Sequence, residues 1–118
     1  MEIPAGAYGL AVLWTTAERE AVLHMVLPYT KDAKLNGGFA VVRLLAWGPS
    51  VRVMSRYGDL GTRMKGLMTD GVVVMADQTC AEEYGAVEAL ETLGVEVVNA
   101  GALLSGMMKD GEWKVLAL

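Results

Sequence analysis

Five short apolar runs recur along the chain, and a longer amphipathic stretch separates each run from the next. The runs cover residues 7–14, 39–47, 72–76, 95–98 and 112–118, and most of them are continuous rather than alternating. Continuous apolar runs are typical of parallel strands that are buried on both faces. The alternation of strand and helix predicts an α/β fold, a three-layer α/β/α sandwich on a mostly parallel five-stranded sheet with flavodoxin-like topology and right-handed crossovers.

Helix signals lie in the stretches between the runs. Thr15 to Glu18 matches a capping box, which predicts a helix to about residue 34 that Pro28 kinks or breaks. Helical pieces follow at about 51–57 and 62–69, with Gly58 and Gly61 as interruptions. A helix after Cys80 is expected to end before the glycine at 94, and a short helix to cover 100–109.

Composition narrows the class of protein. The 118 residues leave room for a single domain, residues 1–118, and 53% of them are hydrophobic. So much apolar material is hard to bury in a small monomer, which favours a homo-oligomer. The net charge of −4 argues against a nucleic-acid partner, and no apolar run is long enough to span a membrane. The first residues lack the basic region of a secretory signal, so we expect a cytoplasmic protein.

Cys80 is the only cysteine, and it follows a predicted buried strand and precedes a predicted helix. In open α/β sheets, ligands and chemistry collect at the carboxyl ends of the strands. Helix N-terminal N–H groups stabilise a thiolate, whereas the carboxylates of Asp77, Glu82 and Glu83 raise a thiol pKa. Two interpretations therefore stay open, a nucleophilic thiol and a small inert residue in a tight turn.

Other chemical candidates are weaker. One cysteine and one histidine cannot supply a four-ligand zinc site, and we expect neither a metal nor a cofactor. His24 lies in a predicted helix with Ala21 and Met25 among the inward positions, where packing is the simpler role. No serine occupies a Gly-x-Ser-x-Gly elbow, and the loop at Thr15 lacks the glycines of a phosphate cradle. Trp14 and Trp47 end predicted strands and could line the same crevice as Cys80.

Three segments together resemble the DsrE/DsrF-like family of small sulfur-relay proteins. Residues 46–51 are similar to the aromatic-Gly-Pro-small-Val segment after the second strand of that family. Residues 71–76 and 80–85 resemble its third strand, cysteine loop and helix start, with a glycine five residues after the cysteine. Residues 94–101 and 107–111 look like its closing strand, helix and turn. Many members have a further cysteine where this chain has Asp77, and an arginine where it has Tyr84.

The resemblance implies a compact α/β/α sandwich that assembles into trimers or hexamers and carries sulfur as a persulfide on the loop cysteine. On that basis Cys80 is the candidate catalytic residue of a sulfur relay between a donor and an acceptor protein, and its pKa is expected below that of a free thiol, about 8.5. The alternative is a non-catalytic oligomeric binding module of the same fold, with a small-ligand crevice near Cys80. The candidate binding residues are Trp47, Gly48, Pro49, Asp77, Thr79 and Thr15.

Overall fold

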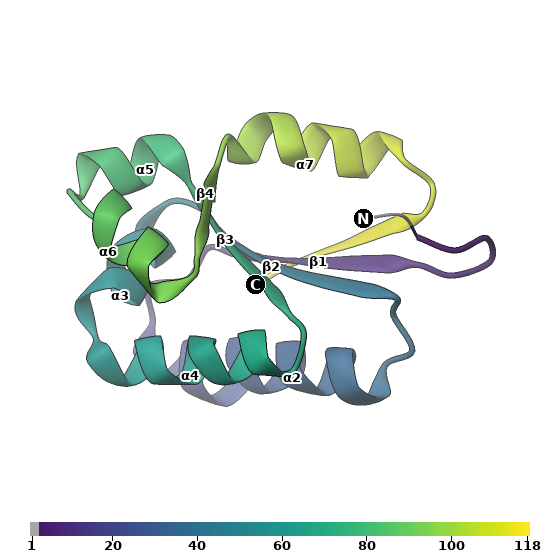
Figure 1. The fold of residues 1–118 in the computed structure, drawn as a ribbon, viewed down its shortest axis with the longest axis horizontal. Helices are drawn as coiled ribbons and strands as arrows, with labels where there is room; N and C mark the ends of the chain where they lie inside the picture. Colours follow the sequence, from purple (N-terminus) through teal and green to yellow (C-terminus); the bar gives the residue numbers. More distant parts are fainter. Residues whose placement is uncertain (1–2) are drawn as a thin grey trace.

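A computed structural model describes residues 3–118, and it contains all five predicted strands. They form one parallel sheet in the order β4-β3-β2-β1-β5 (Figure 1). The strands are β1 (Gly9–Trp14), β2 (Val41–Ala46), β3 (Val73–Asp77), β4 (Glu96–Val98) and β5 (Trp113–Ala117). The α/β class and the sandwich are thus confirmed.

The strand order departs from the 2-1-3-4-5 order of flavodoxin-like folds. From β1 to β4 each new strand is added on the same side of the previous one, and β5 then returns to the free edge of β1. The expected flavodoxin-like topology is therefore wrong in this detail. Local sequence patterns specify that a strand exists, but the choice of its neighbour depends on contacts between distant segments.

Helices cover both faces of the sheet, but unequally (Figure 1). The larger cluster of buried residues lies on the face that carries most helices, and a smaller cluster lies on the other face, which carries only α7. The helices are α1 (Arg19–Ala21), the π-helical turn η1 (Val22–Val26), α2 (Leu27–Asn36), α3 (Pro49–Arg56), α4 (Gly58–Thr69), α5 (Gln78–Glu83), α6 (Val87–Leu93) and α7 (Ala100–Lys109). Among the described residues, no helix is long and apolar enough to cross a membrane.

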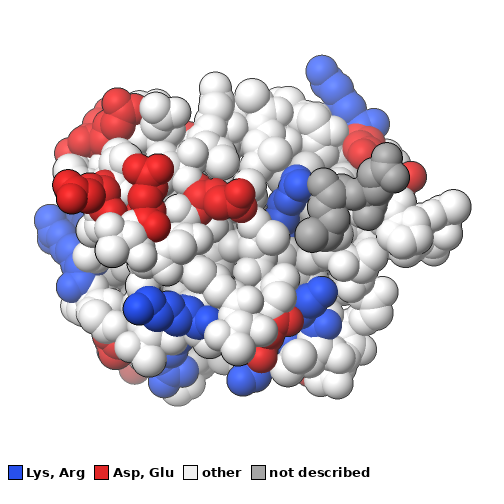
Figure 2. All heavy atoms as spheres, in the orientation of Figure 1, with Lys and Arg blue, Asp and Glu red and all other residues white. Residues whose placement is uncertain are grey.

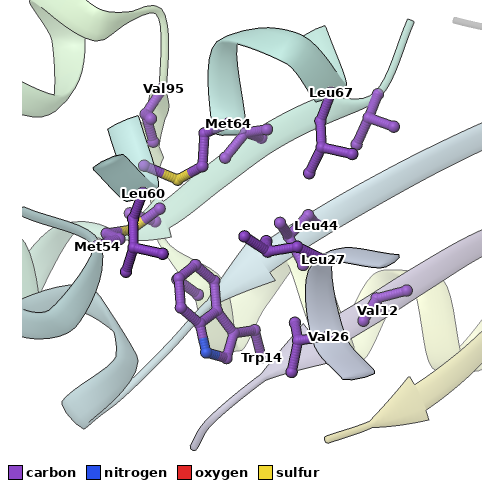
Figure 3. Packing of buried hydrophobic residues seen from close by; sticks show 14 of the residues in the cluster. Val12, Trp14, Val26, Leu27, Leu44, Met54, Leu60, Met64, Leu67 and Val95 are labelled. Carbon is purple, nitrogen blue, oxygen red and sulfur yellow. The ribbon is translucent and has the colours of Figure 1, made fainter. Parts of the chain in front are cut away.

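The larger core lies between the sheet and the helices from α1 to α6. Alternate strand residues such as Val12 and Leu44 belong to it, together with Leu60 and Met64 of α4 (Figure 3). Trp14 is fully buried there, and its indole Nε1 donates to the Thr16 carbonyl at 2.9 Å. The expectation that Trp14 lines a crevice with Cys80 is therefore wrong, because its side chain has no solvent-exposed surface.

The opposite face has only α7 over five strands. Leu45 and Met75 of the sheet are buried against Met107 of this helix, whereas Leu13 and Val73 are only half-buried. A single helix of 10 residues is about 15 Å long, too short to shield a whole five-stranded sheet. Part of this apolar face is consequently open to solvent in the single chain.

The first helical segment starts later than predicted, because the two threonines of the expected capping box make other hydrogen bonds. The Thr15 hydroxyl donates to the Leu118 carbonyl at 3.1 Å, and the Thr16 hydroxyl accepts the Glu18 N–H at 3.1 Å. The helix therefore begins at Arg19, without a capping box. Pro28 causes no break, and the helical run continues to Asn36. The π-helical turn before it changes the hydrogen-bond pattern where proline has no N–H to donate.

The inward positions of that segment also differ from the expected set. His24 and Met25 are exposed, and the buried side chains are those of Val22 and Val26. The wider π-helical turn shifts the angular positions of the residues that follow it. The glycines at 58 and 61 do not interrupt a helix either, since both belong to α4. Gly85, with φ of +62°, instead separates α5 from α6.

Candidate functional site

The carboxyl ends of β3 and β4 form the point where the helical connections diverge. The connection after β3 enters α5, whose Ala81 packs in the larger core. The connection after the neighbouring β4 enters α7, whose Ala100 packs on the opposite face of the sheet. Such a divergence defines the crevice in which open α/β sheets bind ligands. Cys80 lies at this point, in the first turn of α5.

Asp77, the last residue of β3, fills the space between the two helix starts. One carboxylate oxygen, Oδ2, accepts the Cys80 N–H at 3.1 Å, and the other, Oδ1, accepts the Ala100 N–H at 3.1 Å. The side chain is only 6% exposed. Helix N-terminal N–H groups attract anions, so Asp77 acts as a built-in anion where other proteins of this class bind a phosphate or carboxylate.

The environment of the Cys80 thiol follows from this arrangement. Partial burial raises the pKa of Cys80, the backbone N–H of Gly48 acts to lower it, and the Asp77 and Glu83 carboxylates raise it further. The net pKa shift is upward. The direction of this pKa shift is opposite to that expected for an activated thiol, because burial and the Asp77 and Glu83 carboxylates together outweigh the Gly48 N–H.

Gly48 reaches the thiol through an unusual backbone conformation. Its φ of +79° and ψ of −143° lie in a region that is essentially restricted to glycine. Pro49 follows as the first residue of α3 and is exposed. The Gly-Pro pair therefore turns the chain sharply from β2 into α3 and leaves the Gly48 N–H directed to Cys80.

Trp47 and Asn99 determine how α7 begins. The Asn99 side chain caps α7 by accepting the Ala102 N–H at 3.1 Å. The half-buried Trp47 ring lies over the same turn, where a Cβ added at Gly101 would be 3.6 Å from its Cη2 atom. Trp47 therefore packs on α7 beside the site, where its ring forms a wall between β2 and that helix.

The other predicted binding residues are divided between this site and a distant edge. Thr79 is exposed in the first turn of α5, next to Cys80. Thr15 follows β1, which is separated from β3 by β2, so it lies two strand spacings, about 10 Å, from the end of β3. Among residues 3–118, no three metal-ligating side chains of the His, Cys, Asp or Glu type gather into one group.

Sequence reasoning missed the buried Ser50, which joins the ends of β1 and β2. Its hydroxyl donates to the Trp14 carbonyl at 2.5 Å and accepts the Trp47 N–H at 3.1 Å. The side chain is fully buried. No local pattern could reveal this role, because its partner on β1 is 36 residues away. Asn99 was also missed, although an asparagine directly before a helix is a recognisable cap.

We expect Ser50→Ala to lower the free energy of unfolding by about 1–2 kcal/mol, since a buried hydroxyl with two partners is lost. Urea denaturation followed by circular dichroism measures this change. Ser55→Ala is the matched control, because the Ser55 hydroxyl only bonds the Arg52 carbonyl within α3. A loss in Ser50→Ala no larger than in the control would contradict the bridging role.

The fold and site together define a small α/β/α protein with a half-buried thiol at the divergence of its helical connections. Comparison with protein-family models gives no match, and none of the curated proteins matches the chain. Among solved structures, the chain is similar to a conserved protein of unknown function, BT1422 from Bacteroides thetaiotaomicron, with a TM-score of 0.87 and 28% sequence identity over 93% of this chain and 94% of that one.

Two further solved structures share the fold at lower identity. The YchN protein from E. coli has a TM-score of 0.71 and 18% identity, over 94% of this chain and 99% of its own. MTH1491 from Methanobacterium thermoautotrophicum, a protein of unknown function, has the same TM-score and coverage with 20% identity. Both likenesses concern the fold, which the chain shares over nearly its whole length.

Proposed function

We propose that this protein is a sulfur carrier that holds a persulfide on Cys80 and passes its outer sulfur to a partner protein. The observation that carries the proposal is the position of Cys80, a partly accessible thiol in the first turn of α5 with the Gly48 N–H directed to it. A reactive group at this position can meet a partner without any opening of the fold. A backbone N–H beside the sulfur also stabilises the negative charge that sulfur transfer requires.

The chemistry needs no redox agent. The Cys80 thiolate attacks the outer sulfur of a donor persulfide, so that a new sulfur–sulfur bond forms and the donor leaves as a thiolate. An acceptor thiolate then attacks the outer sulfur on Cys80 and displaces the Cys80 thiolate. Both steps are thiol exchanges, and their rates depend on the thiolate fraction and on access.

The charge around the site favours basic partners. Exposed carboxylates of α5 and α6 gather at the end of the molecule that holds Cys80, on the left in Figure 2. They belong to Glu82, Glu83, Glu88 and Glu91. A donor or acceptor with a basic surface would be attracted there, and its positive charge would counter Asp77 and Glu83 and lower the pKa of Cys80 on docking.

Assembly into a homo-oligomer, a trimer or a hexamer, is part of the proposal. It is supported by the partly open apolar sheet face beside α7 and by Met108, whose side chain is 68% exposed. Size-exclusion chromatography with light scattering measures the state in solution. A monomer at micromolar concentration would contradict this part alone.

Incubation with a persulfide donor is expected to add one sulfur atom to Cys80, detected by intact mass. Because Cys80 is the only cysteine, Cys80→Ser removes every thiol and should abolish the gain, with unchanged circular dichroism as the control for folding. Release of the sulfur by an added small thiol would complete one relay cycle. A chain that takes up no sulfur even at alkaline pH would be inconsistent with a carrier.

The raised pKa of Cys80 supports a second candidate, a non-catalytic binding module of the same fold. In that case the crevice beside Trp47 holds a small ligand, and the thiol only packs against it. The two candidates differ in one result. The binding module predicts no persulfide on Cys80 under any condition, and Cys80→Ser would retain its function.

A further inference from the structure

Arg43 is a charged residue in the middle of the sheet, and its role is independent of Cys80. It lies on β2 between Ala11 of β1 and Val73 of β3, and it is half-buried on the face that carries α7. Its guanidinium lies over the Trp113 ring, 4.4 Å from the ring centroid, and its Nη1 atom is 3.4 Å from the Met107 sulfur. Within residues 3–118 it forms no ion pair.

These contacts leave most of the N–H donors of the Arg43 guanidinium without an acceptor among the described residues. It has five N–H donors, and a thioether sulfur is only a weak acceptor for one of them. The stacking on Trp113 holds the planar group in place without occupying its edge. Arg43 is therefore a fixed donor fork that lacks an acceptor of matching geometry among the described residues.

A cavity of about 250 Å³ opens directly beside this fork. Arg43 and Trp113 line it from the sheet, and α7 contributes Leu103 and Gly106. A Cβ added at Gly106 would meet no atom within 4 Å, so the side of the cavity at this residue is open. The space is smaller than the 300–1,000 Å³ of typical drug-sized sites, and it suits a ligand about as large as an amino acid.

The cavity carries a second, opposite charge. Asp110, which follows α7, also lines it, and one of its carboxylate oxygens accepts the Glu112 N–H at 3.0 Å. Asp110 and Arg43 do not pair with each other. The lining therefore offers a cation and an anion that do not pair with each other, together with the apolar side chains of Leu103 and Trp113.

We propose that this cavity binds a free α-amino acid with an apolar side chain. The ligand carboxylate would accept two N–H bonds from Arg43, a geometry that the guanidinium fork matches. The ligand ammonium group would lie near Asp110, and its side chain would pack on Trp113 and Leu103. The cavity lies on the face of the sheet that carries α7, whereas Cys80 packs against the larger core on the other face, so the two sites are separate.

Isothermal titration calorimetry with three probes tests the proposal. The probes are leucine, 4-methylpentanoate, which lacks the ammonium group, and 3-methylbutylamine, which lacks the carboxylate. We expect leucine to bind most tightly, 4-methylpentanoate about 2- to 5-fold more weakly, and the amine not at all. In a nitrogen–proton NMR spectrum, leucine should move the Trp113 indole signal but not that of the buried Trp14.

Substitutions of Arg43 and Asp110 measure how much each charge contributes to leucine binding. Arg43→Met keeps a side chain of similar length and should weaken leucine binding about 10- to 100-fold. Asp110→Asn should bring leucine down to the affinity of 4-methylpentanoate. Lys114→Met is the matched control, because Lys114 lies over the Tyr8 ring and does not line the cavity, so binding should be unchanged.

Several results would overturn the proposal. They are no leucine binding at millimolar concentration, equal binding by a folded Arg43→Met variant, and a preference for the amine over the carboxylate. If Arg43→Met fails to fold, Arg43→Lys replaces it, since a lysine keeps the charge but loses the two-pronged geometry. That variant should still bind leucine more weakly than the native chain.

Discussion

Asp77→Ala is expected to lower the free energy of unfolding by about 3–5 kcal/mol, the largest loss for any polar residue of the site. The native carboxylate accepts N–H groups at the starts of two helices, Cys80 of α5 and Ala100 of α7, and it is almost fully buried. Its removal leaves both donors without their acceptor, and the Ala100 N–H is buried. Small domains have a total stability of only about 5–15 kcal/mol, so the variant should be close to unfolding. Urea denaturation measures the change.

Asn99→Ala is the control for this experiment. Asn99 caps α7 alone, so its loss should cost about 1 kcal/mol. Formate has the size and charge of the carboxylate deleted in Asp77→Ala, and it should restore part of the stability of that variant while leaving Asn99→Ala unchanged. Equal losses in the two variants would show that Asp77 caps one helix at most.

The strands and α7 could be predicted from the sequence because their signals are local. Continuous apolar runs mark strands that are buried on both faces, and the bounds of the last helix, residues 100–109, match the structure. The position of Cys80 at the end of β3 follows from the same run. In an α/β fold, the order of strands and helices along the chain is thus enough to predict where Cys80 lies.

The remaining features depend on contacts between distant segments. The Thr15 hydroxyl bonds Leu118, 103 residues away, so the helix start that its sequence predicts does not form. The acceptor role of Asp77 toward Ala100 joins residues 23 positions apart. The sequence around Asp77 is equally compatible with a carboxylate in solvent. In that position Asp77 would affect neither α7 nor the thiol of Cys80.

The alternative roles of the site converge on one quantity, the thiolate fraction of Cys80. Asp77 is fixed between two helix starts, so the positive helix ends that could stabilise a thiolate are already neutralised. The same residue that stabilises the fold therefore reduces the reactivity of the thiol. A carrier built in this way would react slowly at neutral pH when alone and faster when a basic partner covers α5.

The rate of Cys80 alkylation by iodoacetamide is accordingly expected to rise about tenfold per pH unit from neutral pH until it passes the raised pKa. The chain unfolded in urea provides the reference, and its rate should level off at a lower pH, because burial and the two carboxylates no longer raise the pKa. The raised pKa of Cys80 also makes the free energy of unfolding depend on pH. The stability that the protonated thiol contributes is fully present below the pKa of Cys80 in the unfolded chain, and it is lost as the pH rises through the pKa of Cys80 in the folded chain.

Glu83→Gln should shift the alkylation profile of the folded chain to lower pH, since the Glu83 carboxylate raises the pKa of Cys80. Glu82→Gln is the matched control, because this neighbour is also exposed and is not among the groups that shift the pKa of the thiol. Added polylysine should act like Glu83→Gln on the native chain if a basic partner activates the thiol, and excess salt should cancel its effect. Coincident profiles for the folded and unfolded chains would contradict the raised pKa that burial and the carboxylates of Asp77 and Glu83 give Cys80 in the folded chain.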